Sequence, residues 1–189
     1  MKKSKLRWSA ICVFLSLSIQ ANGQEGGLTP QELLTSLVGS WEGTCRTWFR
    51  PGQLSDESSI SGEFQFIPAG QFLRHTYQGQ IQGRPRVGEE MIAFNSVKKE
   101  FQSSWVDDFH MNYGILFSEG EGTQNGFVVV GKYAVGPDQP SWGWKTVFEL
   151  KDKNHLVITA YNVQPDGGEA MAVETKYRRK RPLQRRNWL

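Results

Sequence analysis

Gly39-Ser40-Trp41-Glu42-Gly43-Thr44-Cys45-Arg46-Thr47-Trp48-Phe49-Arg50-Pro51-Gly52 is the stretch of sequence that decides the fold. It is one long segment of alternating character that opens with Gly-x-Trp and ends at a Pro-Gly turn signal. Just before it, Thr29-Pro30-Gln31-Glu32 supplies an N-cap, a proline at the first helical position and an acidic first turn. The sequence therefore predicts a helix of about two turns that ends at Gly39 and is followed at once by a strand.

The rest of the chain shows almost no helical period. Short alternating segments are separated by turn signals such as Pro68-Ala69-Gly70 and Gln124-Asn125-Gly126. Regular spacing with hairpin-length turns predicts an all-β fold, an antiparallel up-and-down β-barrel with a short N-terminal helix. About ten strands are expected, at residues 40–49, 58–67, 71–81, 87–94, 100–107, 112–119, 126–134, 142–150, 155–163 and 170–179.

Alternation along the strands predicts which side chains face the barrel interior. The residues expected to point inward in the last strands are Trp144, Thr146, Phe148, Leu150, Met171, Val173, Thr175 and Tyr177. In the first strand the phase places Arg46 outside and Cys45 inside, as a small core residue. Cys45 is the only cysteine beyond residue 23, so no intramolecular disulfide is expected.

The first residues are typical of a secretory signal. Four basic side chains within residues 2–7 precede an apolar run over residues 10–19, and Ala21-Asn22-Gly23 supplies small residues for cleavage. The apolar run is about half of the ~20 residues that span a bilayer, which favours a signal over a retained anchor. We expect residues 1–23 to be removed, leaving a secreted protein of the bacterial periplasm that starts near Gln24.

The net charge of +3 is unevenly distributed. Without the predicted signal, the chain has 18 basic and 19 acidic residues, and six of the basic ones lie within residues 178–186. The body before them has 12 basic residues against 19 acidic ones, so it lacks the basic face of a nucleic-acid-binding domain. We expect one barrel domain over residues 24–180, a basic tail over residues 181–189 and no membrane span.

The opening of the first strand resembles that of the lipocalins and calycins. In those barrels a Gly-x-Trp motif follows a helix, and the tryptophan closes the base of the barrel beneath an arginine from the last strand. The resemblance implies this role for Trp41 together with Arg178, with Arg179 as the alternative.

Nearly all of the mature chain resembles the bacterial domain-of-unknown-function family 1579. The motifs that carry the resemblance are Trp41-x-Gly43-x-x-Arg46-x-Trp48-Phe49-x-Pro51-Gly52, His75-x-Tyr77-x-Gly79, Trp105-x-Asp107-x-Phe109-His110, Trp142-Gly143-Trp144 and Thr159-Ala160-Tyr161-Asn162. The resemblance implies a lipocalin/calycin-like barrel in secreted bacterial proteins. It brings no established activity and no catalytic residue.

Aromatic and histidine side chains are the candidate ligand-binding residues. Trp105, Trp144 and Tyr161 are expected to line a cavity, because aromatic rings stack on flat ligands; filling of a closed core is the alternative. His75 lies in the middle of a strand, and His110 follows Asp107 and Asp108 near a strand end; Asp107 is a further candidate ligand-binding residue. A neutral imidazole oriented by Asp107 or Asp108 can ligate zinc or haem iron, whereas a hydrogen-bonded structural histidine is the alternative.

Three functions follow from these observations. The chain has no Gly-x-Ser-x-Gly elbow, no His-Glu-x-x-His and no phosphate-binding glycine loop, which argues against the common hydrolases. The leading hypothesis is a secreted non-enzymatic barrel that binds a small apolar or aromatic molecule. The alternatives are a haem- or metal-dependent barrel enzyme using His110 or His75, and an envelope protein-interaction module that presents loops such as residues 109–113.

Overall fold

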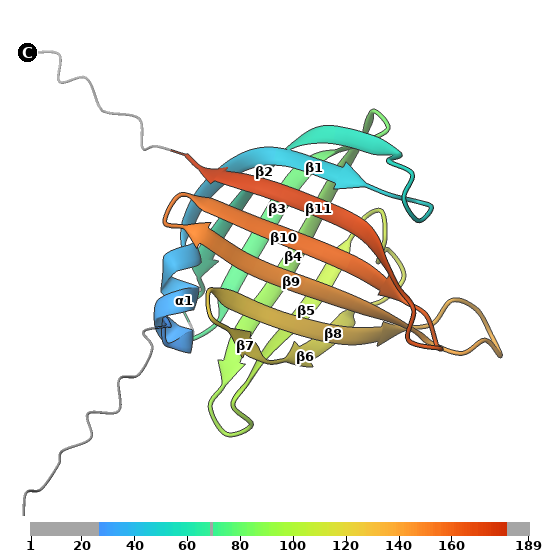
Figure 1. The fold of residues 1–189 in the computed structure, drawn as a ribbon. Coiled ribbons are helices and arrows are strands. Elements are labelled where there is room, and N and C mark those ends of the chain that lie inside the picture. Colours follow the sequence, from blue (N-terminus) through green and yellow to red (C-terminus); the bar gives the residue numbers. More distant parts are fainter. Residues whose placement is uncertain (1–26, 69, 181–189) are drawn as a thin grey trace, which may run out of the picture.

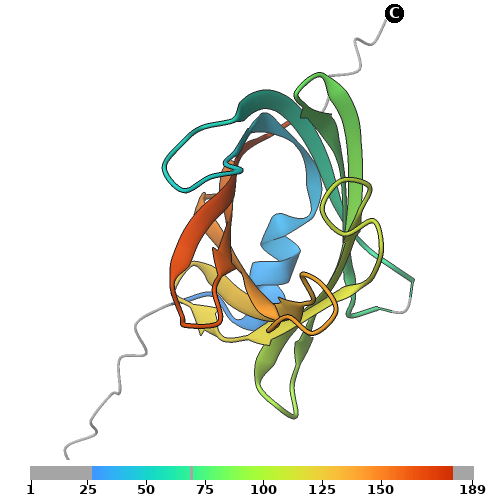
Figure 2. The same ribbon diagram turned by 90° about the vertical axis from the view of Figure 1, so that its right-hand side faces the viewer.

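The computed structural model describes residues 27–68 and 70–180. The predicted signal (residues 1–23) and basic tail (residues 181–189) lie outside the described residues. The described chain is a closed antiparallel barrel with one short helix across one end (Figure 1), and a view along the barrel shows the other end free of helix (Figure 2). The predicted all-β, lipocalin/calycin-like architecture is confirmed.

The elements follow the predicted order. They are α1 (Pro30–Leu37), β1 (Gly39–Thr47), β2 (Asp56–Phe66), β3 (Leu73–Ile81), β4 (Arg84–Asn95), β5 (Glu100–Asp107), β6 (Leu116–Gly120), β7 (Gly122–Thr123), β8 (Gly126–Tyr133), β9 (Trp142–Asp152), β10 (His155–Val163) and β11 (Glu169–Arg179). β6 and β7 are interrupted only at Glu121 and both pair with β8, so they occupy one position in the barrel wall. This gives the ten strand positions that the sequence predicts.

The barrel wall is continuous around its circumference. On one side, β1 pairs with β11 over seven residue pairs and with β2 over nine. On the opposite side, β8 forms two residue pairs with β6 and two with β7. The described residues include no helix that is long and apolar enough to cross a membrane.

The helix α1 begins at the predicted cap. The Thr29 hydroxyl accepts a hydrogen bond from the Glu32 backbone N–H at 3.3 Å, and the Glu32 carboxylate accepts one from the Thr29 N–H at 2.9 Å. This reciprocal capping box satisfies two backbone donors at the start of the helix. Leu33, Leu34 and Leu37 are buried on the opposite side, in the apolar core at the base of the barrel.

The base of the barrel is closed by Trp41 and Arg179. The Trp41 indole N–H donates to the Leu37 carbonyl at 2.8 Å, and the Arg179 guanidinium lies 4.1 Å from the Trp41 ring centroid. Arg179 also donates to the carbonyls of Ser36, Val38 and Lys153. It therefore joins β11 to the end of α1 and to the turn between β9 and β10.

The assignment of Arg178 to this role is wrong. Arg178 lies on the outer face, where it forms a 2.7 Å ion pair with Glu42. Successive residues of a strand point to opposite faces, so a shift of one position exchanges the two arginines. Arg179 takes the place under the barrel that the family resemblance implies for one of them.

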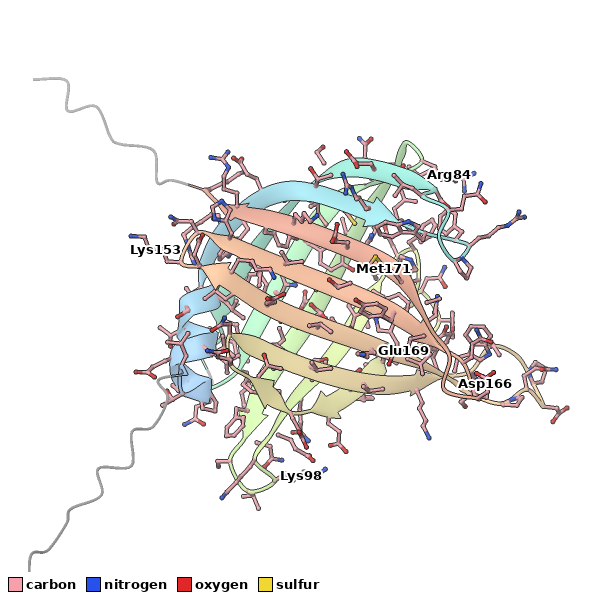
Figure 3. The ribbon with its side chains drawn as sticks, in the orientation of Figure 1. Arg84, Lys98, Lys153, Asp166, Glu169 and Met171 are labelled. Atoms are coloured by element: carbon pink, nitrogen blue, oxygen red, sulfur yellow. The ribbon has the colours of Figure 1, made fainter. Side chains whose placement is uncertain are left out.

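The inner half of the barrel near α1 is packed with aromatic rings. Phe101, Phe127 and Phe148 form a continuous stack with centroid distances of 4.4 Å at each step. Charged side chains such as Lys98, Lys153 and Glu169 lie on the outside (Figure 3). The result is an apolar base, in which stacked rings fill the space between the strands.

The inward set predicted for the last strands is confirmed except at Met171. The register between β10 and β11 shifts between Ala160 and Tyr161, which leaves Ala172 as an extra residue opposite this step. Ala172 is buried, whereas Met171 is only half-buried and pairs with the outward-facing Tyr161. A β-bulge thus reverses the phase that a strict alternation predicts.

The contrast between the two arginines gives a stability test. Arg179→Ala removes three charge-assisted hydrogen bonds and a cation–π contact, so we expect it to lower the free energy of unfolding by about 3 kcal/mol. Arg178→Ala removes one exposed ion pair, and we expect a change below about 0.5 kcal/mol. Urea denaturation of both variants measures the difference; equal losses would contradict the assignment.

Candidate functional site

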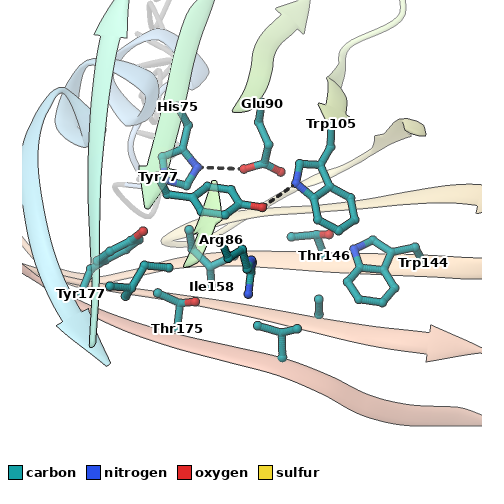
Figure 4. A pocket seen from close by; sticks show the side chains of 13 residues that line it. His75, Tyr77, Arg86, Glu90, Trp105, Trp144, Thr146, Ile158, Thr175 and Tyr177 are labelled. Atoms are coloured by element: carbon teal, nitrogen blue, oxygen red, sulfur yellow. Dashed lines mark hydrogen bonds and ion pairs between the residues drawn. The ribbon is translucent and has the colours of Figure 1, made fainter. Parts of the chain in front are cut away.

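Two cavities lie one behind the other at the end of the barrel opposite α1. The outer one, the mouth pocket, has a volume of about 200 Å³ and is lined by Trp48, Phe49, Trp105, His110, Tyr133 and Trp144, among others. The deeper one, the inner chamber, has a volume of about 50 Å³, and the polar side chains in its wall are His75, Tyr77, Arg86, Glu90, Thr146, Thr175 and Tyr177 (Figure 4).

Trp105 and Trp144 form a partition between the two cavities. Both rings line the mouth pocket and the inner chamber. Their centroids are 5.4 Å apart and their planes are 18° from parallel, so they stack. Any molecule that reaches the inner chamber from the mouth pocket must pass these two rings.

Asp107 holds the loop that follows β5. Its carboxylate accepts backbone hydrogen bonds from Phe109 at 3.0 Å and Met111 at 2.9 Å, and another from the His110 N–H. The predicted strand 112–119 therefore starts only at Leu116, because this capped loop occupies the residues before it. Asp107 keeps its charge. Burial raises the pKa of this carboxyl, but the hydrogen bond and charge of His110 lower it, as do the hydrogen bond from the Met111 N–H and the charge of Arg86. The resulting pKa is about 2.

The same carboxylate anchors a polar chain that ends at the partition. Arg86 Nε lies 3.3 Å from Asp107 Oδ2, and the Tyr77 hydroxyl donates to that oxygen at 3.2 Å. The Trp105 indole N–H in turn donates to the Tyr77 hydroxyl at 2.9 Å. Burial raises the pKa of Tyr77 far above its usual value, so the phenol stays protonated. This network fixes one of the two partition rings.

His75 and Glu90 form the second buried pair of the inner chamber. His75 Nδ1 lies 2.9 Å from Glu90 Oε2, and the imidazole stacks on Phe64 with a centroid distance of 3.9 Å. Three polar atoms in this wall, His75 Nε2, Arg86 Nε and the Tyr177 hydroxyl oxygen, have no hydrogen-bond partner among the described residues, although Arg86 keeps its ion pair with Asp107. Burial raises the pKa of Tyr177 well above its usual value, so its hydroxyl also keeps its proton.

The sequence model of the family described as "Protein of unknown function (DUF1579)" matches residues 28–179. The chain belongs to the DUF1579 family. Among curated proteins, none matches the chain at a significant level. The family assignment thus agrees with the resemblance found in the sequence and brings no activity with it.

Solved structures with similar folds support the architecture of this DUF1579 barrel. The S-type phycobiliprotein lyase CPES from Guillardia theta superposes with a TM-score of 0.59 at 11% identity, covering 82% of this chain and 94% of the lyase chain. Rv2717c from M. tuberculosis superposes with a TM-score of 0.54 at 14% identity, covering 82% of this chain and 99% of its own. At such low identity, the likeness concerns the fold alone.

The predicted ligand-binding residues of the DUF1579 barrel fall into different places. Trp105 and Trp144 line both cavities, His75 lines the inner chamber and His110 the mouth pocket. Their part in binding stays a prediction. Tyr161 is misplaced as a cavity wall: it lies on the outer face, where the Lys145 ammonium is 5.2 Å from its ring centroid. Its neighbour Ala160 takes the inward position on β10.

The two histidines do not meet at a common metal site. They line different cavities, and each uses Nδ1 to contact a carboxylate, Glu90 for His75 and Asp107 for His110. Across residues 27–68 and 70–180, no group of three or more histidine, cysteine, aspartate or glutamate side chains is placed to hold a metal ion. Haem or metal ligation by either histidine remains an untested hypothesis.

Sequence reasoning missed Arg86, Glu90 and Tyr177 as site residues. β4 was expected to begin at residue 87, but it begins at Arg84, so Arg86 lies within the strand. Counting back from the buried Ile92 in steps of two reaches Glu90, Gly88 and Arg86. That alternation was available in the sequence, but charged residues at inward positions contradict the usual apolar pattern.

The charge of Asp107 gives a test of pH dependence. Its folded pKa of about 2 is below the ordinary 3.8, so it contributes stability above about pH 4 that is lost as the pH falls toward 2. This contribution corresponds to about 2 kcal/mol. We expect the free energy of unfolding of Asp107→Asn to fall less steeply between pH 5 and 2 than that of the native protein.

The matched control for this experiment is Asp138→Asn, at an exposed position in the loop between β8 and β9. Its urea-denaturation curves should follow those of the native protein at every pH. Parallel pH profiles for Asp107→Asn and the native protein would show that the buried carboxylate has an ordinary pKa.

Proposed function

We propose that this DUF1579 protein is a secreted, non-enzymatic barrel that binds a small, flat aromatic or apolar molecule in the mouth pocket. The observation that carries the proposal is the mouth pocket itself, walled by the stacked rings of Trp105 and Trp144. Flat aromatic walls gain stacking energy from a flat ligand in addition to the burial of its surface.

The size of the mouth pocket limits the ligand. Its volume of about 200 Å³ is below the range of about 300–1,000 Å³ that is usual for drug-sized ligands. A molecule with one or two fused rings suits this volume better than a large cofactor. Asn162 and His110 are the polar side chains in this wall, and the remaining lining is mainly aromatic and apolar.

The rim of the mouth also suits entry of an apolar molecule. Phe49, after β1, stacks on Phe109, after β5, with a centroid distance of 6.0 Å, and both rings are exposed to solvent. Tyr113 and Ile115 add exposed apolar surface to the same loop. Exposed apolar groups that surround a cavity typically mark a binding site. The alternative of a protein-interaction module uses these rim residues but leaves the pocket behind them without a role.

A stacking test follows from the partition. Trp144→Leu keeps apolar volume but removes a flat ring, and we expect it to raise the dissociation constant for naphthalene at least about tenfold, the equivalent of 1.4 kcal/mol. Phe117→Leu, on the exposed outer face of β6, is the matched control and should bind as the native protein does. NMR titration of the indole N–H signals measures both constants; equal binding by the two variants would contradict a mouth-pocket site.

Secretion and a carried ligand can be tested on one sample. We expect the full chain, expressed in a bacterium, to be recovered from the periplasm with a mass that begins near Gln24. Native mass spectrometry should show additional mass that is lost on denaturation, because a ligand bound without covalent bonds dissociates from the unfolded chain. Recovery of the uncleaved chain in the cytoplasm would contradict secretion.

An absorption spectrum of the same sample separates the binding hypothesis from the haem alternative. We expect no Soret band, with or without added haem. A Soret band that disappears in His110→Gln or His75→Gln would overturn the proposal in favour of a haem protein.

A further inference from the structure

We infer that Asn162 is a specificity-determining residue of the mouth pocket, and that its side-chain amide donates a hydrogen bond to an acceptor on the edge of a neutral, flat aromatic ligand. The inference rests on the proposed function, because the ring of such a ligand would occupy the mouth pocket. The amide then decides which flat molecules bind well there.

Asn162 lies beside the stacking wall. On β10 it is paired directly opposite Trp144 of β9, and directly opposite residues of two antiparallel strands project from the same face of the sheet. Ala160, two positions earlier on the same strand, also faces the interior. Asn162 and Trp144 both line the mouth pocket. The amide therefore borders the space in which a ring stacked on Trp144 would lie.

The amide is held in one orientation by Tyr133. The Tyr133 hydroxyl, from β8, donates to Asn162 Oδ1 at 2.6 Å. Burial, followed by the charge of Tyr113, raises the pKa of Tyr133, so the phenol keeps the proton that it donates. Since this hydrogen bond engages the oxygen of the amide, the NH₂ group is the part left for other partners.

The NH₂ group of Asn162 is available to a ligand. Within residues 27–68 and 70–180 its nitrogen donates no hydrogen bond, and it is not one of the unpartnered polar atoms that are closed off from solvent. Water can therefore serve this donor until a ligand fills the pocket. A ligand without an acceptor would displace that water and leave the donor unpaired, so the pocket discriminates in favour of ligands that carry one.

A neutral acceptor suits this wall better than an anion. The described residues that line the mouth pocket include no lysine or arginine, so a carboxylate would have no fixed cation to pair with. His110, in the same wall, contacts the carboxylate of Asp107, whose pKa of about 2 keeps it negative. An anionic ligand would add a second negative charge at this end of the barrel. The chemical class is therefore a small N-heteroaromatic or aromatic carbonyl compound.

Three probes of one outline test the acceptor. Quinoline and isoquinoline each replace a CH group of naphthalene by a ring nitrogen, which is an uncharged acceptor in mildly alkaline buffer. We expect Asn162→Leu to raise the dissociation constant of the tighter-binding nitrogen probe at least about fivefold more than that of naphthalene. Comparing each probe between native protein and variant cancels the hydration of the free probe. Gln78→Leu, at an exposed position of β3, is the matched control and should change no constant.

NMR on the native protein reports the hydrogen bond directly. The two side-chain N–H signals of Asn162 should move apart when the nitrogen probe binds, because only one of the two hydrogens donates to the ring, and they should move less with naphthalene. Tyr133→Phe releases Asn162 Oδ1, so the amide can turn, and we expect it to reduce both this separation and the preference in affinity. Tyr161→Phe, on the outer face of β10, should leave both unchanged.

The outcomes separate this inference from the proposed function. A preference for the nitrogen probe that depends on Asn162 supports both. An equal effect of Asn162→Leu on all three probes, including no effect, overturns the role of the amide and leaves mouth-pocket binding intact, whereas binding of no probe to the native protein overturns both. Selective weakening of indole, which donates a hydrogen bond but does not accept one, would overturn the acceptor class. The NMR comparison on the native protein stays decisive if Asn162→Leu does not fold.

Discussion

The carboxylate of Asp107 makes the contacts on which the half of the barrel opposite α1 depends. It lies at the end of β5, where it accepts backbone hydrogen bonds from the following loop, and it faces Arg86 and Tyr77 inside the barrel. One side chain therefore sets the shape of the mouth and, through Tyr77, the position of a partition tryptophan. A neutral residue there would leave Arg86 as an uncompensated buried charge.

The barrel divides its interior between stability and chemistry. Near α1, stacked phenylalanines and the Trp41–Arg179 contact close the base with little polar surface. Toward the mouth, the wall carries the buried Arg86–Asp107 ion pair, the buried His75–Glu90 contact and three polar atoms without a hydrogen-bond partner among the described residues. Polar groups in a core cost stability unless they are satisfied, so such a concentration in one half is typical of a binding site. The apolar, closely packed base provides the rigid frame that holds these groups in place.

The sequence predicts the strands, the helix cap and most inward positions, because local alternation and turn chemistry carry that information. It fails where one residue of register decides the outcome. The bulge beside Ala172 moves Met171 to the outside, and a single step along β11 exchanges Arg178 for Arg179. It also fails where charge faces inward, as at Arg86 and Glu90, because the partners that neutralise these residues come from distant strands. The pairing of side chains from distant strands is set by closure of the barrel, and no short segment of the sequence encodes it.

The barrel wall is not equally stiff all the way around. β8 shares two residue pairs with β6 and two with β7, whereas β1 and β2 share nine. The seam between β8 and the β6–β7 position holds only these four residue pairs and the hydrogen bond from the Val128 N–H to the Glu121 carbonyl, so we expect thermal opening of the cylinder to favour this seam. Leu116, at the start of β6, also lines the mouth pocket. The mouth pocket thus borders a weakly paired part of the wall, so its width can adjust without disturbing the closed base.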